Sequence, residues 1–201
     1  AVHAAQTRGV NGMPTRRTLL QTGAATLLAG LGAVVRANTP AADATAPAAL
    51  GELPGAQRLG ASRMRFFGFD IYDAALWVAP GFKASRYAQH ALALELTYLR
   101  SLSGNAIAER SIQEMRRAAD ISATQEQRWL TAMREAFPDV NKGDRITGLH
   151  QPGVGARFWF NGQLRGAVAD PEFSRLFFGI WLAETTSEPT LRSALLAGAA
   201  S

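Results

Sequence analysis

The sequence predicts an α+β domain in which a large antiparallel β-sheet carries its helices on one face. Several short segments alternate apolar and polar residues with period two, which is typical of half-buried strands. Amphipathic stretches with helix-capping signals stand between and after these segments. Asn161-Gly162 separates two of the strand-like segments, and this pair favours a two-residue hairpin turn. Hairpin connections make a sheet antiparallel, and the grouping of strands apart from helices favours the α+β class.

The first strand-forming region covers residues 63–78 and is rich in aromatic and branched side chains. Gly68 marks a tight turn within it, so the region is expected to form two strands. Residues 92–98 then predict a third strand, because four large apolar side chains alternate there with smaller or polar ones: Leu92, Leu94, Leu96 and Tyr98.

A helical hairpin is expected next. The apolar spacing changes to that of an amphipathic helix around residues 107–115. A second helix is predicted to begin at Ser122, which forms a capping-box pair with Gln125, and to end before Pro138.

Strands and then helices fill the remaining chain. Three short apolar segments joined by turn residues predict three more strands, at 145–149, 156–160 and 163–168. Asp170 is a favourable N-cap with Pro171 at the first helical position, so a helix is predicted to begin there. Pro189 is expected to open the last helix, and Gly198 to close it.

The N-terminal region has the composition of an export signal. Arg16 and Arg17 precede a weakly apolar stretch of 13 residues, 23–35, and no acidic residue occurs before residue 43. This pattern predicts that residues 1–42 are an N-terminal extension and a twin-arginine-type signal peptide, and that the protein is periplasmic. The apolar stretch is shorter than the roughly 20 residues of a membrane span, so no stable span is expected.

The rest of the chain is predicted to be a linker followed by one domain. Residues 43–55 are rich in Ala, Pro and Gly and predict a flexible linker, and residues 56–201 are expected to form the domain. The whole chain has 21 basic and 16 acidic residues, but only 17 basic against 16 acidic remain from residue 43 onward. This part of the sequence has no basic stripe of the kind that nucleic-acid-binding domains carry. Cysteine is absent and His90 and His150 are isolated, so neither a metal nor a cofactor is predicted.

A series of motifs in order resembles the chalcone isomerase-like family, particularly its exported bacterial branch. The resemblance extends over essentially residues 58–198. The motifs are LGASR at 59–63, FDIYDAALWV at 69–78, FPDVNKGDRI at 137–146, NGQLRG at 161–166, DPEF at 170–173, FGIWL at 178–182 and LRSALL at 191–196.

The resemblance implies an apolar cleft between the sheet and the helices. Members of this family include enzymes that cyclise chalcones, fatty-acid-binding proteins and non-catalytic partner proteins. The strand pattern places the family's ligand-facing arginine at Arg63 and its hydroxyl residue at Tyr72, where the isomerases carry threonine. The isomerases' Tyr and Asn pair would fall near Gly104 and Ser111, and neither residue is preserved. Ser111 remains a candidate ligand contact.

These candidates favour binding over catalysis. An arginine at an apolar cleft is costly to desolvate unless an anionic group pairs with it. A guanidinium suits a carboxylate, and a phenol such as that of Tyr72 adds a further donor. Each buried methylene of a ligand contributes about 0.8 kcal/mol. The sequence therefore predicts a cofactor-free protein that binds a fatty acid or a similar amphipathic anionic ligand.

Two other functions and one structural interpretation stay open. The domain could be an intramolecular lyase of the chalcone isomerase type, with Arg63 and Tyr72 acting on a small phenolic or enone substrate. It could also be a structural or partner-binding protein whose cleft is filled by its own side chains. Arg63 could simply form an ion pair with Asp70 or Asp73. Arg65 would share a face with Arg63 on a regular strand, so the choice between the two arginines rests on the family pattern.

Overall fold

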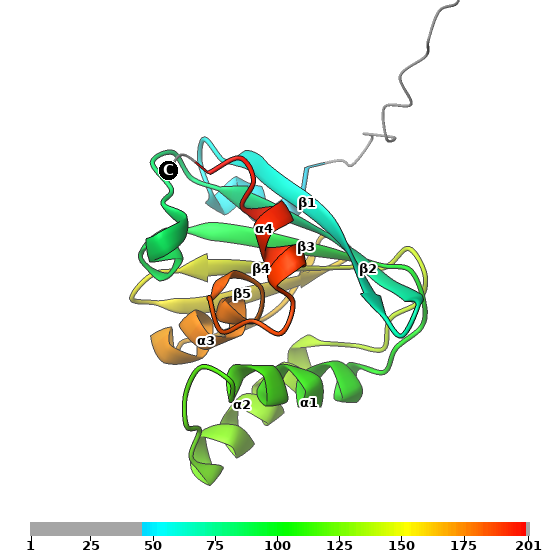
Figure 1. The fold of residues 1–201 in the computed structure, drawn as a ribbon. Coiled ribbons are helices and arrows are strands. Elements are labelled where there is room, and N and C mark those ends of the chain that lie inside the picture. Colours follow the sequence, from blue (N-terminus) through cyan, green and yellow to red (C-terminus); the bar gives the residue numbers. More distant parts are fainter. Residues whose placement is uncertain (1–45, 200–201) are drawn as a thin grey trace, which may run out of the picture. The chain divides into compact units, whose positions relative to one another are not determined.

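The computed structural model describes residues 46–199, which contain one six-stranded antiparallel sheet (Figure 1). The spatial order of the strands is their order in the sequence, so each strand pairs with its neighbours along the chain. The strands are β1 Gln57–Phe66, β2 Phe69–Val78, β3 Leu92–Tyr98, β4 Arg145–Gln151, β5 Gly155–Phe160 and β6 Gln163–Val168. The export signal predicted for residues 1–42 lies outside the described residues.

Four α-helices pack on one face of the sheet (Figure 1). They are α1 Gly104–Met115, α2 Ala123–Ala136, α3 Pro171–Leu182 and α4 Pro189–Leu195. Two short 3-10 helices, η1 Ala48–Glu52 and η2 Ala84–Gln89, complete the described elements. The predicted α+β class, with an antiparallel sheet and helices on one face, is confirmed.

The larger core lies between the sheet and the four α-helices. Period-two alternation in β3 directs Leu92, Leu94 and Leu96 into this core, where all three are buried. Rings from β5 and α3 pack together there, and Phe173 stacks on Phe177 with ring centroids 5.5 Å apart. The largest fully buried side chains are Trp129, Phe158, Phe173 and Phe178, which come from α2, β5 and α3.

A smaller core lies on the opposite face of the sheet. Ala49 and Leu53, in and just after η1, are buried against three outward-facing sheet residues, Ala93, Leu149 and Trp159. For residues 48–53 the structure thus shows a packed helical turn where the composition predicts a flexible linker. Small side chains allow a backbone to lie close to a sheet, and a prediction based on large apolar residues misses this kind of contact.

Candidate functional site

An apolar cavity of about 340 Å³ lies between the sheet and the helices α1, α3 and α4. Its volume falls in the range of small-molecule sites, roughly 300–1,000 Å³. The described side chains therefore leave open space beneath the helices. The apolar part of the lining includes Met64, Phe66, Ile71, Leu96, Leu102, Ile107, Phe137, Ile146, Phe177, Ile180, Trp181 and Leu191.

Tyr72 is the central polar residue of the cavity. Its hydroxyl accepts a hydrogen bond from Nε1 of Trp181 at 3.0 Å, so the phenolic proton is available to a ligand. Burial raises the pKa of Tyr72 to about 12; the Trp181 hydrogen bond opposes this rise, and the charges of Glu188 and Glu114 add to it. Tyr72 is consequently a neutral hydrogen-bond donor at neutral pH.

Tyr98 contributes a second phenol to the lining. It is the direct cross-strand partner of Tyr72, and the two ring centroids lie 6.1 Å apart. Burial raises the pKa of Tyr98, and the neighbouring Tyr72 adds to the rise. The alternation in β3 predicts that Tyr98 is a core-facing residue. Its position beside Tyr72 depends on the register between β2 and β3, which the alternation does not give.

Helix α1 supplies three further polar residues of the lining, and the segment before α4 supplies Ser187 and Glu188. Ser111 lies in the cavity wall, where its Oγ donates to the backbone oxygen of Ile107 at 2.8 Å. Nη2 of Arg110 lies 2.5 Å from Oε1 of Glu114, and the Arg110 side chain is 56% exposed against 9% for Glu114. Oε2 of Glu114 is buried and has no hydrogen-bond partner among the described residues. The wall formed by α1 therefore presents both hydrogen-bond donors and acceptors.

Arg63 does not line the cavity. Its Nε and Nη2 donate to Oδ1 and Oδ2 of Asp73 at 2.7 and 2.9 Å, and its Nη1 donates to Asp70 at 3.0 Å. Arg65 also pairs with Asp70, at 2.7 Å. These ion pairs correct the prediction that the Arg63 guanidinium ends the apolar cleft, and they match the structural interpretation that the sequence left open.

A β-bulge explains why Arg63 faces away from the cavity. Near the hairpin turn Arg65 pairs with Asp70, and a regular register would continue this pairing to Arg63 opposite Tyr72. The register instead shifts between Met64 and Arg65, so that Met64 lies opposite Tyr72. Direct partners in an antiparallel pair share a face, and a shift of one residue exchanges the two faces of a strand. Met64 therefore enters the cavity and Arg63 lies on the outer face.

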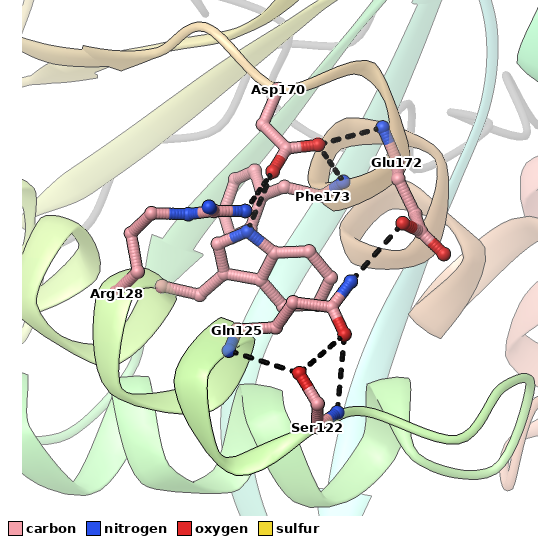
Figure 2. A network of polar contacts seen from close by, with 7 residues as sticks. Ser122, Gln125, Arg128, Asp170, Glu172 and Phe173 are labelled. Atoms are coloured by element: carbon pink, nitrogen blue, oxygen red, sulfur yellow. Dashed lines mark hydrogen bonds and ion pairs between the residues drawn. The ribbon is translucent and has the colours of Figure 1, made fainter.

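Asp170 joins helices α2 and α3 (Figure 2). Its Oδ1 caps α3 by accepting from the backbone nitrogens of Glu172 and Phe173 at 3.0 and 3.1 Å. Its Oδ2 accepts from Nε1 of Trp129 at 2.9 Å and from Nη2 of Arg128 at 2.8 Å, both on α2. One carboxylate thus fixes the N-terminus of α3, the helix that carries Trp181, against α2.

His150 is buried away from the cavity lining. Its Nε2 lies 3.0 Å from the backbone oxygen of Ala88, and its Nδ1 lies 2.6 Å from Oγ of Ser174. Burial lowers the pKa of His150, so these contacts connect η2, β4 and α3 through a neutral ring. In residues 46–199, no three His, Cys, Asp or Glu side chains converge as metal ligands, and no helix is long and apolar enough to cross a membrane.

Comparison with known proteins assigns the domain to a family. The sequence profile of the chalcone isomerase-like family matches residues 59–197. The chain belongs to this family. Among solved structures, the crystal structure of a fatty-acid-binding protein from Arabidopsis thaliana resembles this chalcone isomerase-like domain. The TM-score is 0.56 at 13% sequence identity, over 71% of this chain and 87% of the plant chain, which shows a shared fold. No curated protein matches the chain.

Proposed function

We propose that this chalcone isomerase-like domain binds a fatty acid or a similar amphipathic molecule. The hydrocarbon chain occupies the cavity, and the polar group lies near the hydroxyl of Tyr72. The observation that carries the proposal is the distribution of polarity in the cavity: its lining is mainly apolar, and it includes a few polar side chains, among them Tyr72, Ser111 and Arg110. The structural relative named as a fatty-acid-binding protein supports the same class of ligand.

Most of the binding free energy would come from the hydrocarbon chain. Each buried methylene contributes about 0.8 kcal/mol, so twelve contribute roughly 10 kcal/mol before the costs of association. Those costs begin at about 4 kcal/mol. The polar groups around Tyr72 therefore select and orient the ligand, while burial of its tail supplies the affinity.

Arg110 is the cation best placed to receive a carboxylate head group. It lies in the cavity lining midway along α1, whereas Arg63 is held on the other face by Asp70 and Asp73. A guanidinium has five N–H donors, so Arg110 can pair with a ligand while one donor stays with Glu114. The hydroxyl of Tyr72 supplies a further donor to the same head group.

The head-group assignment is tested by titrating dodecanoate and its methyl ester while tryptophan fluorescence is recorded, because Trp181 lies in the cavity wall. The wild type is expected to bind the acid about tenfold more tightly than the ester, since the charge-assisted pair is worth about 1.5 kcal/mol or more. Arg110→Gln removes this preference. Tyr72→Phe weakens binding of both ligands.

Arg134→Gln is the matched control, because Arg134 pairs with Glu109 outside the cavity lining. This variant keeps both the affinity and the preference for the acid. Absence of saturable binding by either ligand would contradict the proposed function. Retention of the preference in Arg110→Gln would contradict the role of that residue alone.

Cyclisation of a chalcone is not part of the proposal. That chemistry needs a guanidinium and ketone-orienting groups inside the cleft. Arg63, the arginine to which the family pattern assigns this role, lies outside the cavity, and a Cβ at Gly104 would lie 2.0 Å from the backbone oxygen of Phe137, so no larger side chain fits at this position of α1. The available groups, Tyr72, Ser111 and Arg110, suffice for binding.

We also propose that the protein is exported to the periplasm by the twin-arginine route, from the composition of residues 1–42. Replacing Arg16 and Arg17 together with lysine is expected to leave most of the protein in the cytoplasm, because the route reads the arginine pair. Cell fractionation measures this change. Equal periplasmic recovery of wild type and variant would contradict the proposed route.

A further inference from the structure

The tip of the β1–β2 hairpin exposes three phenylalanines, Phe66, Phe67 and Phe69, called here the aromatic tip. Phe67 is 86% exposed, Phe69 60% and Phe66 48%. Phe66 also belongs to the cavity lining. The aromatic tip is therefore an apolar protrusion at the edge of the proposed ligand site, and a contiguous exposed apolar group of this kind marks an interaction site.

The backbone of the aromatic tip is strained. Phe67 and Gly68 have φ values of 48° and 79°, nearly those of Asn161 and Gly162, which are 49° and 82°. A turn with positive φ at both central residues favours Asn-Gly, and a bulky residue in the first position is a strained exception. The same turn thus occurs twice in this domain, with asparagine in one hairpin and phenylalanine in the other. Because Phe67 is exposed, burial does not compensate the strain, and strain retained at such a position points to a function.

Arg100 lies beside the aromatic tip, and Lys142 is exposed on a loop that Ser101, the residue after Arg100, contacts. The guanidinium of Arg100 lies 5.0 Å from the centroid of the Phe69 ring and makes no ion pair with the described residues. Lys142 is exposed on the neighbouring loop, where Oγ of Ser101 donates to Oδ1 of Asn141 at 3.0 Å. Exposed phenyl rings next to arginine and lysine match the boundary between acyl chains and anionic head groups.

We propose that the aromatic tip docks onto a membrane surface containing anionic lipids. The three rings insert at the head-group boundary, and Arg100 and Lys142 contact lipid phosphates. A two-residue turn at the end of a hairpin is convex and offers far less than the roughly 800 Å² per partner of a stable protein interface. Since Phe66 is shared by the aromatic tip and the cavity lining, docking places the cavity next to the bilayer. Docking itself does not depend on the proposed function; transfer of a lipid-derived ligand through this contact does.

Vesicle co-sedimentation of the full chain tests the docking. Wild type and variants carry the same residues 1–45, so any contribution of that region is common to all. Vesicles of phosphatidylglycerol and phosphatidylethanolamine are compared with vesicles of phosphatidylcholine, without added fatty acid. Phe67→Asn is expected to weaken binding to the anionic vesicles about tenfold or more, because its ring supplies the most exposed part of the tip. Arg100→Gln weakens binding to the anionic vesicles and leaves binding to phosphatidylcholine unchanged.

Phe67→Asn keeps the test independent of folding, because asparagine suits the positive φ at this turn. Its unfolding midpoint is expected to equal or exceed that of the wild type. The chain has no cysteine, so an environment-sensitive dye on Phe67→Cys reports insertion by a blue shift, while the same dye on Val154→Cys, in the turn between β4 and β5, does not.

Equal vesicle binding by wild type and Phe67→Asn overturns the proposal. A concentration-dependent dimer or a protein complex that Phe67→Asn abolishes, with no effect on vesicles, also overturns it in favour of a protein interface. The vesicles contain no fatty acid, so failure of docking leaves the titrations of the cavity unaffected, and failure of those titrations leaves docking unaffected.

Discussion

Replacing Asp170 with alanine is expected to lower the free energy of unfolding by about 2–4 kcal/mol. Loss of the cap on α3 accounts for about 0.5–2 kcal/mol. The indole N–H of Trp129, which is fully buried, would lose its acceptor, and an unsatisfied buried donor costs about 1–3 kcal/mol. Urea denaturation measures the change. A loss below about 1 kcal/mol would show that Asp170 does not join α2 to α3 as described.

Glu172→Ala is the matched control on the same helical turn. Glu172 is exposed, and its carboxylate accepts one hydrogen bond, from Nε2 of Gln125 at 3.2 Å (Figure 2). Its removal is expected to cost less than about 1 kcal/mol, as for other exposed polar pairs.

The effect of Asp170 also has a defined pH dependence. Burial raises the pKa of Asp170, but hydrogen bonds from Trp129 and from the backbone nitrogens of Phe173 and Glu172 outweigh burial, and the pKa lies below its ordinary value. The unfolded chain therefore takes up the proton at a higher pH than the folded one does. The stabilisation is complete above the unfolded pKa of about 3.9 and is lost as the pH falls through the folded value. The difference between wild type and Asp170→Ala should be constant from pH 8 to pH 6, and a difference that shrinks there would contradict the assignment.

Replacing Ser111 with phenylalanine is expected to weaken binding of dodecanoate about 30-fold or more. The added ring would occupy part of the 340 Å³ cavity and exclude two or three methylenes of the ligand. At about 0.8 kcal/mol per methylene this is about 2 kcal/mol, or roughly 30-fold in the dissociation constant. The unfolding midpoint should not fall, because the ring enters open space and the lost hydrogen bond to Ile107 is local.

Ser193→Phe is the control for this substitution. Ser193 also lies in a helix and donates to a carbonyl four residues earlier, that of Pro189 at 2.9 Å, but it is exposed and does not line the cavity. Its replacement should leave ligand affinity unchanged. Equal affinities for Ser111→Phe and wild type would place the ligand elsewhere.

Local signals predicted most of the fold. The capping box of Ser122 and Gln125 is present as the sequence indicates, with both hydrogen bonds formed, and α2 begins at the next residue. Asn161 and Gly162 adopt the positive φ values of the expected turn between β5 and β6. Such features depend on residues a few positions apart, so the sequence alone contains them. The helical turn of residues 48–52 was missed because its burial depends on the sheet beneath it.

The site was predictable only in part, because its residues come together through contacts between segments that are distant in the sequence. Tyr72 and Ser111 line the cavity, as the family pattern implies, and Arg63 does not. The register shift between Met64 and Arg65 decides that Met64, and not Arg63, lies opposite Tyr72. Neither period-two alternation nor the family pattern shows where a β-bulge inserts an unpaired residue. Arg110 was missed because only the packing of α1 against the sheet brings it to the cavity.

One amphipathic molecule is proposed to occupy the cavity between the sheet and the helices. Native mass spectrometry of protein purified without detergent, then incubated with dodecanoate, tests this occupancy most directly. One bound molecule per chain is expected for wild type and Ser193→Phe, and a much smaller bound fraction for Ser111→Phe at the same concentration of dodecanoate. Wild type without bound ligand, or Ser111→Phe with the same bound fraction as wild type, would contradict it.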